Sequence, residues 1–246
     1  MSADAALDLL ADPKTRIVNV VTIREGLRLT QLIAELSKAT KLPLADFEAA
    51  VKDPTVFGLP ADLPNLDGYL FPATYEINKG DTAVDLIRSM VERMNVELDK
   101  FGVKNADRHK VLTLASIVQR EARATADFFK VARVFQNRLD VGMPLQSCAT
   151  ISYLTSGSTF TNTPEERASK NPYNTYLYPG LPVGPIGAPG TTAIDAALHP
   201  VKGPWFYFVA VNLETGETEF NETYAGHLKS VKRWDAWLRA NPSWIE

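Results

Sequence analysis

Hydrophobic residues along the chain recur mainly at helical spacing, roughly three or four residues apart, and only short runs show the pattern of strands. Helical spacing predicts helices in these segments: 30–41, 43–53, 82–98, 107–124, 126–142, 191–200 and 223–241. Apolar and β-branched runs predict strands at 17–23 and 205–212, the second with a hairpin partner at 215–221. Segment 144–157 fits either a helix or a strand. This mixture, with no internal repeat, predicts an α+β fold.

The first strand and the two helices after it form a unit too small to bury much surface alone, so we expect it to pack on the larger remainder. Segment 57–80 is rich in proline and glycine and is predicted to be ordered but irregular. The C-terminal helix is expected to bury one apolar face. The residues at core spacing on that face are Leu228, Val231, Trp234 and Leu238.

One predicted helix places a carboxylate on its apolar face. At about 100° per residue, Glu121 lies only about 20° from Leu114, and Ile117 and Val118 belong to the same stripe. One interpretation is a buried structural Glu paired with an arginine, and periodicity alone favours it. The candidate partners are Arg120, Arg123, Arg133 and Arg138. The other interpretation is an acid whose pKa is raised by apolar surroundings, so that it can donate a proton near neutral pH.

The stretch NPYNTYLY, residues 171–178, also has two interpretations. It could be a turn packed by tyrosine rings. It could equally be a sugar-binding platform, because tyrosine faces stack on pyranose rings and asparagine amides bind hydroxyl and acetamido groups. Composition does not choose between them.

The run PGLPVGPIGAPG, residues 179–190, reads either as a flexible linker or as a rigid loop. We favour a rigid loop that lines a cleft, because Leu181, Val183 and Ile186 are apolar and a capped helix follows directly. Such a loop would resist limited proteolysis.

Composition narrows the classes of function. The 246 residues carry a formal net charge of −3, which gives no case for a nucleic-acid partner, since such partners favour a basic surface. The single cysteine, Cys148, excludes an internal disulfide. There is no apolar run of about 18 residues that would span a membrane, and no signal-peptide pattern follows Met1. The spacing of His109, His199 and His227 predicts no metal site, and nothing indicates an organic cofactor.

Taken in order, several motifs resemble the YceG-like family of endolytic murein transglycosylases, from Leu66 to the C-terminus. They are LDGYLFPATYEI, LASIVQREA, VFQNRLDVGMPLQS, NPYNTYLYPGLPVGPIGAPG, AIDAALHP, YFVAV and the late pair Phe220 and His227. The resemblance implies a partial LysM-like subdomain at residues 1–58 and a catalytic domain at residues 59–246. It also implies that the chain is the extracytoplasmic portion of a longer protein, which a missing N-terminal helix anchors to the outer face of the bacterial cytoplasmic membrane.

The resemblance further implies an enzyme that cuts within peptidoglycan glycan strands, between N-acetylmuramic acid and N-acetylglucosamine, and leaves 1,6-anhydro ends. Its catalytic acid would be Glu121. Residues expected to bind substrate are Gln146, Tyr153, Tyr173, Asn174, Thr175 and Tyr176. Peptidoglycan strands are the expected partner, and peptidoglycan synthases are a candidate one. The alternatives are a wall-binding or scaffolding module with weak or no activity, and a hydrolytic muramidase.

Two positions depart from the family pattern. Gln119 stands where the motif often has a second acidic residue, which leaves Glu121 as the motif's only carboxylate. Cys148 stands where an Asp is usual, in LQSCAT, and this is the one feature that favours the scaffolding alternative. Neither departure removes the single acid that a lytic transglycosylase needs.

Overall fold

The computed structural model describes residues 2, 19–155 and 162–244, and in these it combines helices with two separate two-stranded antiparallel sheets. The predicted α+β class is confirmed. The elements are β1 (Asn19–Thr22), α2 (Leu29–Thr40), α3 (Leu44–Ala50), η2 (Pro54–Phe57), β2 (Thr74–Ile77), α4 (Ala83–Lys100), α5 (Asn105–Glu121), η3 (Thr125–Asp127), α6 (Phe128–Asp140), α7 (Cys148–Thr155), α8 (Pro164–Arg167), α9 (Thr191–Leu198), β3 (Tyr207–Ala210), β4 (Thr218–Asn221), α10 (Tyr224–Ala240) and η4 (Pro242–Trp244).

The N-terminal strand, the two helices after it and the first half of α4 share one hydrophobic core. Fully buried side chains there include Leu36, Phe47 and Ile87. Strand β1 pairs with β2, which lies inside the segment predicted to be irregular, so that prediction was incomplete. The four residues of β2 are a short alternating run between proline and glycine, too brief to stand out by pattern.

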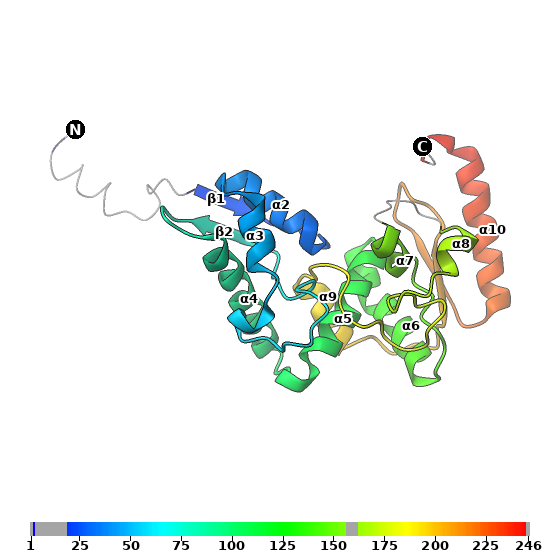
Figure 1. Ribbon diagram of the computed structural model, residues 1–246. Coiled ribbons are helices and arrows are strands. Elements are labelled where there is room, and N and C mark those ends of the chain that lie inside the picture. Colours follow the sequence, from blue (N-terminus) through cyan, green and yellow to red (C-terminus); the bar gives the residue numbers. More distant parts are fainter. Residues whose placement is uncertain (1, 3–18, 156–161, 245–246) are drawn as a thin grey trace.

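The predicted division at residues 58 and 59 stays a prediction. A first unit that contains both strands of its own sheet extends at least to Ile77, because β2 supplies the partner of β1. Figure 1 shows this unit at one end of the molecule, with α10 at the other.

A second core surrounds α5, which packs against α6, α7 and α9. Ile117 and Val118 of α5, Phe135 of α6 and Ile194 of α9 are almost fully excluded from solvent. The central position of α5 in Figure 1 agrees with this packing. The apolar stripe predicted from periodicity is therefore the inward face of a core helix.

The second half of the proline- and glycine-rich loop is packed into the molecule, whereas Val183 in its first half is exposed. Residues 184–190 are buried, and their backbone groups bond inward: the Ile186 N–H donates to Ser116 Oγ and the Gly190 N–H to Gln119 Oε1, each at 3.0 Å. Gly68 of the LDGYLF motif (φ 80°) touches this loop, and a Cβ there would lie 2.4 Å from Pro185 Cβ. This part of the loop therefore joins elements, and the expectation that it lines an open cleft is wrong for residues 184–190.

The predicted hairpin is confirmed: β3 pairs with β4, with Phe208 opposite Phe220. Helix α10 packs on this hairpin, but its expected apolar face is only partly covered. Leu228 is 42% exposed, and among the described residues of this helix only Ser230 is buried. A two-stranded sheet is too narrow to cover a helix of this length, so the prediction that Leu228 belongs to the core was wrong.

Candidate active site around Glu121

Glu121 is the last residue of α5, and its half-buried carboxyl group meets the start of α7. Its Oε1 accepts hydrogen bonds from Ser147 Oγ at 2.5 Å and from the Ala149 N–H at 3.0 Å. Ala149 is the second residue of α7, so the backbone donor comes from a helix N-terminus, where negative charge is stabilised. Both bonds use the same oxygen and fix how the carboxyl group is turned.

The carboxyl group of Glu121 has more polar surroundings than its apolar stripe predicts. The apolar residues of its stripe lie behind it in the core, and the carboxyl group itself meets polar donors because α5 ends there. Three of the four candidate arginines donate to backbone carbonyls: Arg120 to that of Gly26, Arg133 to that of Val201 and Arg138 to that of Leu145. For Arg123, burial lowers the pKa of the guanidinium and the nearby charge of Glu121 raises it.

The loop that bonds Glu121 is itself held by Thr175. The Gln146 N–H donates to the Thr175 carbonyl at 2.9 Å, and the Ser147 N–H donates to Thr175 Oγ1 at 3.0 Å. Thr150 Oγ1 lies 2.9 Å from the same hydroxyl. Gln146 has a left-handed backbone (φ 49°) and an exposed side chain, so the loop turns this amide toward solvent. Gln146 therefore remains a candidate for substrate contact.

Asn174 and Thr175 are buried, and both are hydrogen-bonded to segments outside residues 171–178. The Asn174 side chain donates to the Arg167 and Ser169 carbonyls at 2.9 and 2.7 Å and accepts from the Tyr176 N–H at 2.9 Å. Each of these bonds would have to break for the amide to reach a sugar. For this pair we therefore infer a positioning role through the 146–150 loop rather than contact with substrate.

Tyr176 lies beside Glu121 and Cys148. Its hydroxyl is 3.1 Å from Cys148 Sγ, and the Arg167 guanidinium lies 5.1 Å from the centre of its ring. Burial raises the pKa of both the Tyr176 hydroxyl and the Cys148 thiol, and the charge of Glu121 adds to both shifts. The two groups are therefore neutral at physiological pH and act as a polar wall of the site.

Tyr153, near the end of α7, pairs with Tyr173, with ring centres 4.8 Å apart. The Tyr153 hydroxyl donates to Asp67 Oδ2 at 2.9 Å and accepts from Asn65 Nδ2 at 3.1 Å. Burial raises the pKa of Asp67 to about 6. The structure thus turns Tyr153 toward the N-terminal unit, away from the groups that hold Glu121.

The sequence analysis gave no role to Ser147 and considered Arg138 only as a candidate partner of Glu121. Ser147 lies in the motif LQS and supplies the shortest contact to Glu121. Arg138 is buried and bonds the carbonyl of Leu145, at the start of the loop that carries Ser147. The available signal was a polar serine directly before a helix, in a segment left ambiguous between helix and strand.

Among the described residues, no group of three or more His, Cys, Asp or Glu side chains is arranged to hold a metal ion. In the same part of the chain, no helix has the length and apolar character needed to cross a membrane.

The chain is similar to several known proteins over most of its length. Residues 1–233 match the model of the YceG-like family. An endolytic murein transglycosylase of Bacillus subtilis (strain 168) is 35% identical over 254 residues, which cover 95% of this chain and 70% of the relative. One of Streptococcus pneumoniae serotype 2 (strain D39 / NCTC 7466) is 31% identical, and the match covers 89% of this chain and 45% of the relative. The crystal structure of a yceG-like protein from Listeria monocytogenes matches with a TM-score of 0.76 and 32% identity, over 93% of this chain and 81% of that one.

Proposed function

This chain belongs to the YceG-like family, and from that premise we propose that it is an endolytic peptidoglycan transglycosylase with Glu121 as its acid and then its base. The relatives named endolytic murein transglycosylases support the reaction class. The assignment of Glu121 as the acid is supported by the two hydrogen-bond donors that orient its carboxyl group through one oxygen. We place the reaction at the extracytoplasmic face of the cytoplasmic membrane, where peptidoglycan lies.

The proposed reaction needs one carboxyl group and no water. Protonated Glu121 gives its proton to the oxygen of the bond between N-acetylmuramic acid and N-acetylglucosamine, and the bond from C1 of the muramic acid to that oxygen breaks. The C6 hydroxyl oxygen of the same muramic acid then bonds to C1, and Glu121, now a carboxylate, takes the hydroxyl proton. The products are a 1,6-anhydro end and a free hydroxyl, and the acid is restored.

The contacts of Glu121 suit both stages of this cycle. Ser147 Oγ and the Ala149 N–H occupy Oε1, so we assign proton transfer to Oε2. When Glu121 becomes a carboxylate, the same donors and the N-terminus of α7 stabilise its charge. We further propose that the exposed amide of Gln146 binds the acetamido group of the muramic acid, which can assist at C1 as positive charge develops there.

The test is a digest of purified sacculi with the wild-type protein and with Glu121→Gln, followed by mass spectrometry of the new ends. Gln keeps an oxygen acceptor for Ser147 and Ala149 but cannot supply the proton. We expect anhydro ends from the wild type, a loss of about 10³-fold in the variant, and nearly equal melting temperatures.

Other results would favour other functions. New reducing ends would indicate a hydrolytic muramidase, which generally requires a second carboxylate beside the acid. Retention of the protein on sacculi without new ends would indicate a binding or scaffolding module. A Glu121→Gln protein that still produced anhydro ends would show that another residue is the acid.

A further inference from the structure

One buried guanidinium connects the site around Glu121 to the β3–β4 hairpin. Arg138 of α6 donates through Nη1 to the Leu145 carbonyl at 2.5 Å and through Nε to the Phe206 carbonyl at 2.7 Å. Leu145 begins the loop that bonds Glu121, and Phe206 directly precedes β3. A single planar group with fixed donor geometry therefore sets the position of the hairpin relative to Glu121.

Beyond this guanidinium lies an aromatic cluster that the proposed chemistry does not use, made of Tyr207, Tyr224 and His227. Arg138 lies 5.4 Å from the centre of the Tyr207 ring. His227 stacks on Tyr207 with ring centres 5.4 Å apart and planes at 23°, and Tyr224 lies 5.8 Å from Tyr207. Tyr224 is 58% exposed, so this cluster opens to solvent.

The cluster contains an unused polar atom. Among the described residues, His227 Nδ1 is buried and has no hydrogen-bond partner, although nearly all buried polar atoms in folded proteins are paired. Burial first, and then the charge of Arg138, lower the pKa of His227, so its imidazole is neutral near pH 7. A neutral imidazole offers one donor and one acceptor, which suits an uncharged hydroxyl or acetamido group.

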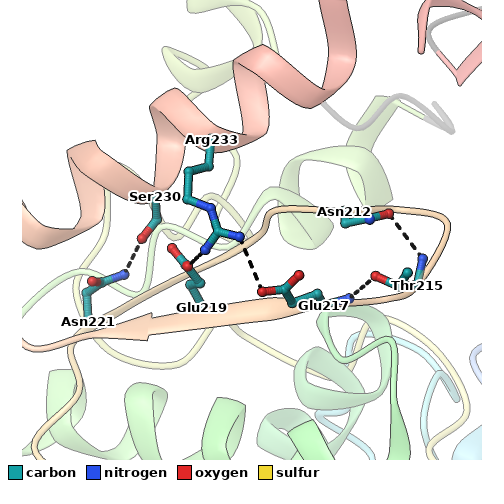
Figure 2. A network of polar contacts seen from close by, with 7 residues as sticks. All are labelled: Asn212, Thr215, Glu217, Glu219, Asn221, Ser230 and Arg233. Carbon is teal, nitrogen blue, oxygen red and sulfur yellow. Dashed lines mark hydrogen bonds and ion pairs between the residues drawn. The ribbon is translucent and has the colours of Figure 1, made fainter. Parts of the chain in front are cut away.

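Polar contacts tie the helix that carries Tyr224 and His227 to the hairpin that carries Tyr207. Figure 2 shows Arg233 of α10 paired with Glu217 and Glu219 of the hairpin, and Asn221 Nδ2 donating to Ser230 Oγ at 2.9 Å. These contacts lie one to two turns after His227 on α10 and fix that helix against β4. Tyr224 and His227 are therefore presented beside Tyr207 without the cost of ordering a loop.

We propose that Tyr207, Tyr224 and His227 form a second carbohydrate subsite, which binds a sugar of the glycan strand at a distance from the bond cut at Glu121. This inference rests on the proposed function. Exposed aromatic faces stack on the apolar faces of pyranose rings, and the imidazole bonds a hydroxyl or acetamido group. A subsite away from the reacting bond favours strands that continue past it, which is the property that makes cutting endolytic.

The test compares long, peptide-free glycan strands with tetrasaccharides from the same strands. We would measure kcat/KM on both for the wild type, for Tyr224→Ala, and for His227→Phe, which keeps a ring and removes the nitrogens. We expect the ratio of kcat/KM on long strands to that on tetrasaccharides to fall about five- to tenfold in each variant, mainly through KM. Leu228→Ala changes an exposed apolar residue of the same helix and should leave the ratio unchanged.

A ratio that stays at the wild-type value in both variants overturns the subsite. An equal loss on both substrates also overturns it, because a merely structural role acts regardless of strand length. Binding of the long strands to the Glu121→Gln protein, with and without Tyr224→Ala, separates this inference from the proposed reaction. Weaker binding after Tyr224→Ala supports the subsite even without turnover, and equal binding contradicts it.

Discussion

The two ends of α7 are held by different partners. At its start, Ser147 Oγ and the Ala149 N–H bond the carboxyl group of Glu121. Near its end, the Tyr153 hydroxyl donates to Asp67, and the Ser152 carbonyl accepts from Arg28 Nη2 at 2.8 Å. The first end therefore belongs to the proposed chemistry, and the second anchors the helix to the N-terminal unit.

Because the two ends have different partners, mutations at one end should mainly affect turnover and mutations at the other should mainly affect stability. A change at the start of α7 should alter turnover more than stability, because the bonds there orient the half-exposed carboxyl group of Glu121. A change at the end should alter stability and leave turnover per folded molecule nearly constant.

The largest expected effect is a pH dependence of stability that arises from Asp67. Its pKa is about 6 in the folded protein against an ordinary 3.8, because burial disfavours its charged form. The folded protein therefore holds this proton more tightly than the unfolded chain does. Asp67 contributes most to the free energy of unfolding below pH 3.8. As the pH rises through about 6, this contribution falls by on the order of 3 kcal/mol.

Urea unfolding of the wild type and of Asp67→Asn at pH 4.5 and pH 7.5 measures this pH-dependent contribution to stability. The free energy of unfolding of the wild type, relative to that of the variant, should be lower at pH 7.5 than at pH 4.5. A pH dependence that is identical in both proteins would show that Asp67 does not carry its proton into the folded state. Turnover per folded molecule at pH 7.5 should be similar in the two proteins, which keeps this effect apart from the start of α7.

The next effect is on turnover, through Ser147→Ala. The substitution removes one of the two hydrogen bonds to Glu121 Oε1 and leaves the Ala149 donor in place. We expect kcat to fall about tenfold, since one charge-assisted hydrogen bond contributes roughly 1.5 kcal/mol. Ser147→Thr keeps the hydroxyl and should recover part of the rate. A kcat unchanged in the alanine variant would mean that Ser147 does not orient the acid.

How far the sequence could predict these features depends on how local their causes are. Helix α5 was predicted with Glu121 near its end because helical periodicity depends only on neighbouring residues. The family motifs named the same carboxylate independently.

Features that depend on distant segments could not be predicted in this way. Asn174 looked like a sugar-binding amide, but its side chain donates to the Arg167 and Ser169 carbonyls, which reach it only when the chain between them folds back. The hydrogen bond from the Ser147 N–H to Thr175 Oγ1, by contrast, joins positions 28 residues apart. Composition indicates which residues can make such bonds and does not indicate which partner each one takes.

The smallest expected effect tests the end of α7 directly. Tyr153 was a candidate for binding substrate, whereas the structure gives its hydroxyl to Asp67 and Asn65 and places the Arg28 guanidinium 5.7 Å from its ring centre. Tyr153→Phe keeps the ring and its packing on Tyr173 and removes only the hydroxyl. An anchoring role predicts a loss of about 1 kcal/mol in the free energy of unfolding, with kcat/KM on sacculi within about twofold of the wild type. Contact with substrate predicts the reverse, a several-fold rise in KM at unchanged stability. Chemical denaturation and initial-rate measurements on the same preparation decide between the two. An anchoring hydroxyl changes the free energy of unfolding, whereas a hydroxyl that binds sugar changes KM.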